Sequence, residues 1–162
     1  MRRVVVTGIG TINSTGHNVK DSFEAVVNGV CGIDTITLFD ASEFSVKIAG
    51  EVKDFDPTTV MDKKEVKKAD RFIQLGIKAA LEAMIDSGYV TQEDKKVDAS
   101  IADRFGMISG SGIGGLSTIE RNSIVCETKG SRKVSPFFIP SSLANMLSGF
   151  ISIEHNLRGP SL

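Results

Sequence analysis

Residues 105–115 read FGMISGSGIGG, an apolar run that leads directly into a glycine-rich turn. The run predicts a buried strand over 105–109, and a helical stretch follows the glycines over about 116–125. The chain begins in a similar way, because the β-branched run 3–8 predicts a first buried strand and the apolar spacing predicts a helix over 18–27. Strands that alternate with helices favour a layered α/β fold.

The rest of the chain is less regular. Residues 63–84 are rich in good helix formers with a dense apolar stripe, which predicts one helix buried on most sides. A last apolar helix is expected over about 141–153. Short apolar stretches between 33 and 56 predict extended pieces and loops, and the charged stretch 90–104 predicts a surface connection.

Composition excludes several classes of protein. The 162 residues are 41% hydrophobic and 24% charged, as in an ordinary globular domain. Nineteen basic and twenty acidic residues give a net charge of −1, so we expect no nucleic-acid partner for the molecule as a whole. No apolar run approaches the roughly 18 residues that span a bilayer, so no membrane partner is expected.

The glycine turn matches a nucleotide-binding pattern. Gly110, Gly112 and Gly115 form G-x-G-x-x-G between a predicted strand and a predicted helix, where backbone amides would hold a pyrophosphate. The acidic residue expected about 20 positions later, which would bind the ribose, is missing. A nucleotide-binding oxidoreductase domain is therefore the less favoured alternative, and close backbone packing is the favoured reason for these glycines.

The cysteines and histidines do not form a recognisable catalytic set. Cys31 follows a predicted helix C-terminus and Cys126 ends a helix, neither of which stabilises a thiolate. The two cysteines lack C-x-x-C spacing, so no metal site or disulfide framework is expected, as suits a reducing cytoplasm. His17 and His155 are the only histidines, and we expect both at the surface or in capping positions.

Positive charge is concentrated in one stretch. Lys63, Lys64, Lys67, Lys68 and Arg71 lie within nine positions, and helical spacing would place the last four along one face. A solvated helix face is the simplest interpretation, although such charge on a near-neutral molecule suits an acidic protein partner.

Four ordered stretches carry a family resemblance: RVVVTGIG at 3–10, SGSGIGG at 109–115, KVSPFFIP at 133–140 and LRGPS at 157–161. In order and separation they resemble the β-ketoacyl-acyl carrier protein synthase II family of the thiolase superfamily. The resemblance implies that residues 1–162 are the N-terminal portion of a thiolase-like αβαβα layered α/β fold, incomplete in this chain. It also implies fatty-acid elongation by decarboxylative condensation of an acyl-enzyme with malonyl-acyl carrier protein, in a cytoplasmic homodimer that needs no cofactor or metal.

The same resemblance assigns roles to particular residues. Ile113 would line the acyl pocket, and Phe138 would reach across the dimer to close the partner's pocket. The acidic acyl carrier protein would dock on five cations: Lys64, Lys67, Lys68, Arg132 and Lys133. The nucleophilic cysteine of the family is expected after Leu162, so we expect this chain alone to be inactive. A non-catalytic carrier-protein-binding module is the second hypothesis.

Overall fold

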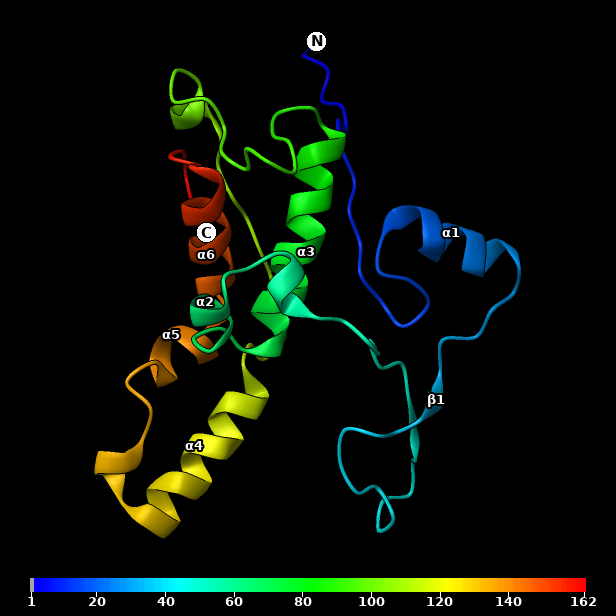
Figure 1. Ribbon diagram of the computed structural model, residues 1–162, viewed down its shortest axis with the longest axis vertical. Coiled ribbons are helices and arrows are strands. Elements are labelled where there is room, and N and C mark those ends of the chain that lie inside the picture. The colour runs from blue at the N-terminus through cyan, green and yellow to red at the C-terminus, as the bar shows by residue number, and fades with distance from the viewer. Residues whose placement is uncertain (1) are drawn as a thin grey trace.

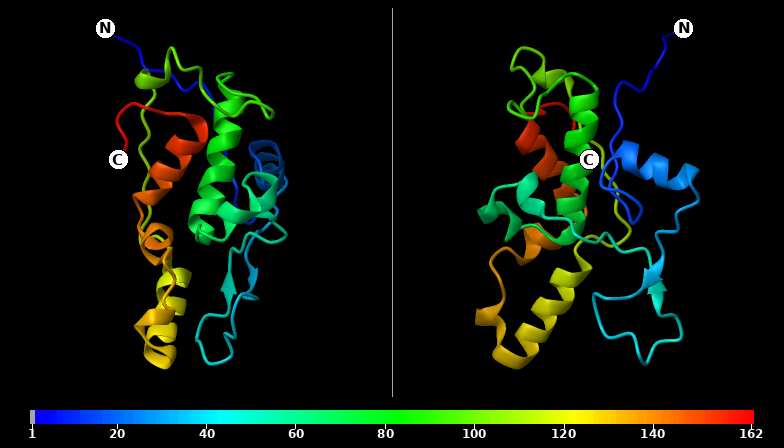
Figure 2. Two further views of the ribbon diagram at one scale, coloured as in Figure 1. Left: turned by 60° about the vertical axis from the view of Figure 1, so that its left-hand side comes forward. Right: turned by 45° about the vertical axis from the view of Figure 1, so that its right-hand side comes forward.

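The computed structural model describes residues 2–162, and two long helices form its centre. Helices α3 (Arg71–Asp86) and α6 (Met146–His155) lie side by side in both Figure 1 and Figure 2. Their facing side chains, among them Ile73 and Ile77 of α3 and Ile151 of α6, are almost fully buried and belong to one hydrophobic cluster. This apolar stripe on α3 is the one that the sequence predicted.

Smaller helices extend this pair. The predicted helix over 18–27 is confirmed as α1 (Val19–Val27), which begins at Asn18, whose side chain accepts a hydrogen bond from the Asp21 amide at 2.8 Å. The predicted helix after the glycine turn is confirmed as α4 (Leu116–Lys129), which runs four residues beyond the expected end. The remaining helical segments are α2 (Lys63–Val66) and α5 (Phe138–Ser142), with 3₁₀ turns at Pro57–Thr59 (η1), Ala102–Arg104 (η2) and Ser131–Lys133 (η3).

The extended pieces expected between 33 and 56 form a small antiparallel arm, which projects beside α4 in Figure 1. Strand β1 (Asp34–Thr35) pairs with β2 (Ile48–Ala49). Just beyond β2, the Glu51 carboxylate accepts hydrogen bonds from the amide and hydroxyl of Thr37 and from the amide of Leu38. The carboxylate therefore fixes the chain where it leaves β1.

These hydrogen bonds to the Glu51 carboxylate, here called the Glu51 brace, make the arm sensitive to acid. The hydrogen bonds from Thr37, its side chain first, lower the pKa of Glu51. A lowered pKa in the folded state means that the brace is intact above the ordinary carboxyl pKa and is lost as the pH falls through the lowered value. We expect the Thr37 and Leu38 amides to lose protection from hydrogen exchange over that acidic range in wild type. In Glu51→Ala, which removes the acceptor oxygens, protection should be low and independent of pH; acid-sensitive protection in that variant would contradict the account.

The prediction of two buried strands is wrong. The run 3–8 has no strand partner within residues 2–162, and Val4 is 97% exposed. The run 105–109 forms a single parallel bridge, Met107 with Ser161, and Ile108 is 77% exposed. Apolar composition marks a segment suited to the interior of a sheet, but burial requires neighbours on both edges and both faces. Residues 2–162 provide these two segments with only some of those neighbours.

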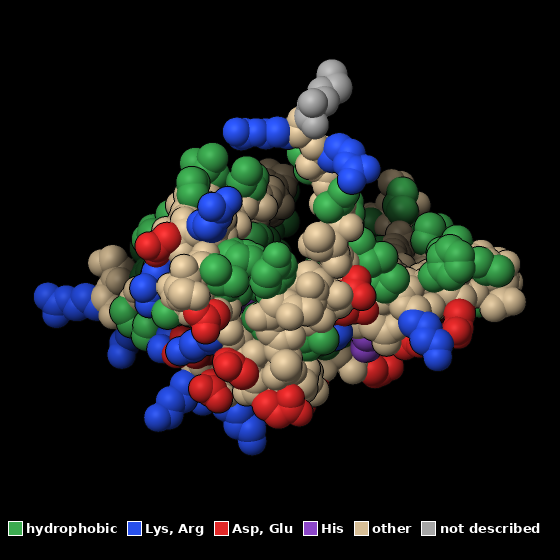
Figure 3. Space-filling model, turned by 90° about the horizontal axis from the view of Figure 1, so that it is seen from above, with side chains coloured by type: hydrophobic (Ala, Val, Ile, Leu, Met, Phe, Trp, Pro, Cys, Tyr) green, Lys and Arg blue, Asp and Glu red, His purple; other side chains and the backbone are tan. Residues whose placement is uncertain are grey.

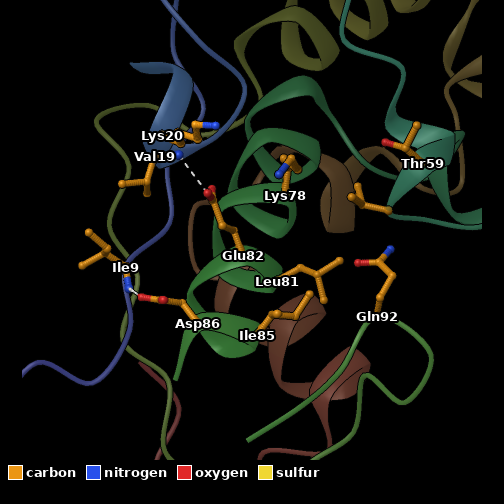
Figure 4. A pocket seen from close by; sticks show the side chains of 11 residues that line it. Ile9, Val19, Lys20, Thr59, Lys78, Leu81, Glu82, Ile85, Asp86 and Gln92 are labelled. Atoms are coloured by element: carbon orange, nitrogen blue, oxygen red, sulfur yellow. Dashed lines mark hydrogen bonds between the residues drawn. The ribbon is translucent and has the colours of Figure 1, made fainter. Parts of the chain in front are cut away.

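The N-terminal run is instead fastened to α3 by backbone amides. Ile9 donates to the Asp86 carboxylate at 2.9 Å, as Figure 4 shows. The two oxygens of Glu82 accept from Thr11 at 3.0 Å and from Val19 at 2.8 Å. Glu82 therefore joins the end of this run and the start of α1 to the central helix.

The single helix predicted over 63–84 is also wrong, because the chain breaks between α2 and α3. Asp70 has an extended backbone (φ −66°, ψ 164°), and the Gln74 side-chain amide donates to the carbonyls of Val66 and Ala69. These side-chain bonds replace the backbone ladder that would continue the helix, an effect that helix propensity does not report. The break also separates Arg71 from the lysines of the predicted cationic face. The Arg71 guanidinium donates hydrogen bonds to the carbonyls of Val52 and Phe55.

Two smaller expectations are corrected as well. The helix predicted over 141–153 is two helices, α5 and α6, separated where Leu143 is extended (ψ 133°). The stretch 90–104 is not purely a surface connection, because Val97 and Ala102 are buried in it.

Candidate functional site

The glycine turn before α4 divides into an exposed half and a packed half. A Cβ added to Gly110 or Gly112 would meet no atom within 4 Å, so their surroundings are open. Gly114 has a φ of 84°, in the left-handed region that favours glycine. A Cβ on Gly115 would lie 2.5 Å from the Ser141 carbonyl oxygen, so backbone packing requires glycine there. Close backbone packing therefore accounts for glycine at positions 114 and 115 but not at positions 110 and 112.

A carboxylate already occupies the N-terminus of α4. Asp70 is 8% exposed, and its Oδ2 accepts a hydrogen bond from the Thr118 amide in the first turn at 2.9 Å. Negative charge is stabilised at this end of a helix. A pyrophosphate bound in the manner of a dinucleotide site would have to compete with this fixed carboxylate, which argues against the oxidoreductase alternative.

Removing this cap should weaken the fold. Replacing an N-terminal capping side chain with alanine costs about 0.5–2 kcal/mol, and we expect Asp70→Ala to lie in the upper half of that range because the site is buried. Urea unfolding measures the change, with Asp103→Ala, an exposed acidic residue in η2, as the control. Equal stabilities for the two variants would show that the cap contributes nothing.

The two residues predicted to line an acyl pocket come from adjacent segments. Ile113 lies in the exposed half of the glycine turn and is 64% exposed. Phe138 is the first residue of α5 and is half-buried. A hydrogen bond from the Gly115 amide to the Ser142 carbonyl at 2.9 Å joins the turn to α5. Neither side chain lines the two larger cavities that flank α3.

The five predicted docking cations fall into two groups. Lys64 and Lys67 are exposed at α2. Lys68 is held in place by Glu65 (Nζ to Oε1, 2.6 Å) and by the ring of Phe137, whose centroid is 5.5 Å from Nζ. The second group, Arg132 and Lys133, is exposed on the turn Ser131–Lys133 that follows α4.

The cysteines and histidines form no catalytic pair. Cys31 and His17 line one hollow of about 250 Å³, but the only hydrogen-bond partner of the thiol among the described residues is the Ile33 carbonyl at 3.8 Å. Cys126 is exposed on α4. His155 is fully buried, contrary to the expected surface position, and its Nδ1 donates to the Lys95 carbonyl at 2.7 Å. No sequence pattern signalled this contact, because residues 95 and 155 meet only through folding.

Neither a metal site nor a membrane span is found in the described part of the chain. Over residues 2–162, no three His, Cys, Asp or Glu side chains are grouped so that they could bind a metal ion. Over the same residues, no helix has the length and apolar character needed to cross a bilayer.

Two larger cavities flank α3. The cavity drawn in Figure 4, of about 610 Å³, lies between the N-terminal run, α1 and α3, and none of the predicted site residues lines it. The other, of about 750 Å³, lies between the arm, the α2–α3 break and α4, and Lys67 lines it. Apolar side chains also reach the surface between charged ones, as the face in Figure 3 shows.

Comparison with known sequences gives a consistent result over the whole chain. The sequence model of the family described as "Beta-ketoacyl synthase, N-terminal domain" matches residues 1–162. The chain is 48% identical over 161 residues to the 3-oxoacyl-[acyl-carrier-protein] synthase 2 of Vibrio harveyi and 44% identical over 161 residues to that of Coxiella burnetii. Each match covers 99% of this chain and 37% of the relative, so the chain spans well under half the length of these relatives.

Solved structures agree on the fold. The ishigamide ketosynthase/chain length factor superposes with a TM-score of 0.81 at 27% identity, over 99% of this chain and 39% of that one. A type II polyketide ketosynthase in complex with its acyl-carrier protein superposes with a TM-score of 0.75 at 23% identity, over 98% of this chain and 40% of that one. The expected fold, the N-terminal part of a thiolase-like ketosynthase, is thus confirmed. The chain belongs to the β-ketoacyl synthase family and matches its N-terminal domain.

Proposed function

We propose that residues 1–162 are the N-terminal portion of a ketosynthase domain whose complete enzyme elongates fatty acids. In this reaction an enzyme thiolate takes an acyl group from acyl carrier protein. Malonyl-acyl carrier protein then loses carbon dioxide, and the resulting carbanion attacks the acyl thioester, which forms a carbon–carbon bond and releases the thiolate. The observation that most supports this proposal is the sequence identity of 44–48% to 3-oxoacyl-[acyl-carrier-protein] synthases 2 over 99% of the chain.

The chemistry is proposed to reside in the complete enzyme. A nucleophilic thiolate needs a neighbouring base or a helix N-terminus. Among the described residues, neither Cys31 nor Cys126 is hydrogen-bonded to a base, and neither lies at a helix N-terminus. We therefore assign the nucleophile to a segment other than residues 1–162, and we assign to this chain the acyl-pocket residues Ile113 and Phe138 and a docking surface. A two-carbon extension assay on the complete enzyme tests the proposal.

The proposed partner is acyl carrier protein, with the complete enzyme acting as a cytoplasmic homodimer as the family resemblance implies. The docking surface comprises Lys64, Lys67, Lys68, Arg132 and Lys133. Its support is electrostatic, because four of these five cations are exposed and positive charge gathered on a molecule of net charge −1 attracts an acidic partner. One of the structural neighbours is itself in complex with an acyl-carrier protein.

Charge reversal should slow this encounter. In the complete enzyme, Lys67→Glu together with Lys68→Glu should lower the association rate with the carrier protein by about tenfold at low salt, because opposed surface fields steer encounter. The loss should shrink at physiological ionic strength, where the Debye length is about 8 Å. Stopped-flow binding measures it, and Lys96→Glu is the control for an exposed lysine elsewhere. An unchanged rate at low salt would mean that the lysines form only a solvated surface.

A further inference from the structure

The cavity of about 750 Å³ beside the arm has an exposed apolar wall. Leu38 and Phe39, in the segment of the arm that follows β1, line it and are 82% and 55% exposed. Leu75 of α3 also lines this cavity. The volume lies within the range of about 300–1,000 Å³ typical of small-molecule sites. Two apolar side chains held largely in water are thus available to be covered by a ligand.

Five charged residues line the same cavity: Glu51, Lys67, Asp70, Arg71 and Arg121. Three of them are already engaged. Glu51 accepts from Thr37 and Leu38, Asp70 caps α4, and the Arg71 guanidinium donates to the Val52 carbonyl at 3.1 Å.

The other two charges are both positive. Lys67 directly follows α2 and Arg121 belongs to α4, and neither has a carboxylate partner in the structure described for residues 2–162. Among residues 2–162, the cavity therefore has two cations without a carboxylate partner and an apolar wall.

We infer that this cavity binds a linear aliphatic anion. The anionic head lies against Lys67 and Arg121, and the chain covers Leu38 and Phe39. A fatty carboxylate and an alkyl phosphate share this chemistry. The cavity is separate from the glycine turn and from Phe138, neither of which lines it. The inference does not depend on condensing activity.

The test uses the ¹⁵N-labelled chain of 162 residues and follows amide shifts in NMR titrations with decanoate, decyl phosphate, decanol and decyltrimethylammonium. Both anions should shift the Leu38, Phe39 and Arg121 amides, and preference between them identifies the head group. Neutral decanol should bind about tenfold more weakly and the cation not at all. Dodecanoate should bind more tightly than decanoate, by up to about fourfold per added methylene that is buried.

Variants separate the two parts of the site. Lys67→Gln with Arg121→Gln should weaken decanoate binding about tenfold, whereas Lys47→Gln with Lys129→Gln, two exposed lysines outside the cavity, should not. Leu38→Ser should weaken binding severalfold without affecting folding, since Leu38 is 82% exposed. Equal binding of decanol and decanoate would overturn the inference. So would shifts confined to other residues, or a concentration-dependent dimer whose contact covers Leu38 and Phe39.

Discussion

Replacing Gly10 with alanine should destabilise the chain by about 3 kcal/mol, at the upper end of the usual cost of overpacking. A Cβ at this position would lie 2.0 Å from the carbonyl oxygen of Ala79 and 2.7 Å from the amide nitrogen of Ala83. Both atoms belong to the backbone of α3, which cannot swing aside as a flexible side chain would. The N-terminal run must therefore move away from the helix. Its amide bonds to Glu82 and Asp86 should break as it does so.

Gly110→Ala is the matched control, because a Cβ there meets no atom within 4 Å. Urea unfolding gives the free energies of the two variants. Hydrogen exchange at the Ile9 and Thr11 amides reports whether the run has left α3, and both should exchange faster in Gly10→Ala alone. Equal stability of the two variants, with both amides still protected, would show that the approach of this run to α3 is not a constraint on the fold.

Replacing Ile113 with phenylalanine should change the acyl-chain selectivity of the complete enzyme. Ile113 is 64% exposed and is not part of the hydrophobic core described for residues 2–162, so it does not fill a gap in this chain. Gly112 and Gly114 on either side leave its backbone unobstructed by a Cβ. If the side chain lines the proposed acyl pocket, a larger ring there should reject long acyl chains and spare short ones. Each buried methylene contributes about 0.8 kcal/mol, so the rate should fall about fourfold for each carbon that no longer fits.

The measurement is kcat/KM for a series of acyl-carrier proteins of increasing chain length, compared between wild type and Ile113→Phe. Ile113→Ala serves as the volume control and should extend the range of chain lengths or leave it unchanged. A uniform loss at all lengths, accompanied by a lower Tm, would place Ile113 in the core of the complete enzyme and exclude the pocket role.

Much of the helical framework was predictable from local patterns. The apolar spacing of α1 and the apolar stripe of α3 are each encoded within a few residues, so α1 lies where it was predicted and the stripe was identified although the bounds of its helix were wrong. The break before α3 was not predicted, because helix propensity does not report the side-chain bonds of Gln74 to the Val66 and Ala69 carbonyls. Strand burial failed for a different reason. An apolar run such as 3–8 is suited to the interior of a sheet. Whether it is buried depends on neighbouring strands and helices that are distant in sequence.

The candidate site was predictable only through its family resemblance. Among the described residues, neither Cys31 nor Cys126 is hydrogen-bonded to an imidazole. Local sequence patterns gave no sign that Arg71 turns away from the other cations or that His155 is buried. Both follow from backbone carbonyls brought close by folding, those of Val52 and Lys95. The roles of Ile113, Phe138 and the docking cations remain predictions.

The most direct test of the proposed function is a two-carbon extension assay followed by mass spectrometry of the carrier-protein products. The complete enzyme that contains this chain, given acyl- and malonyl-acyl carrier proteins, should yield a β-ketoacyl product two carbons longer and release one carbon dioxide per cycle. The chain of 162 residues alone should yield none. A folded complete enzyme that binds carrier protein without extending the acyl chain would contradict the account, as would extension by the 162-residue chain that is abolished by Cys31→Ser or Cys126→Ser.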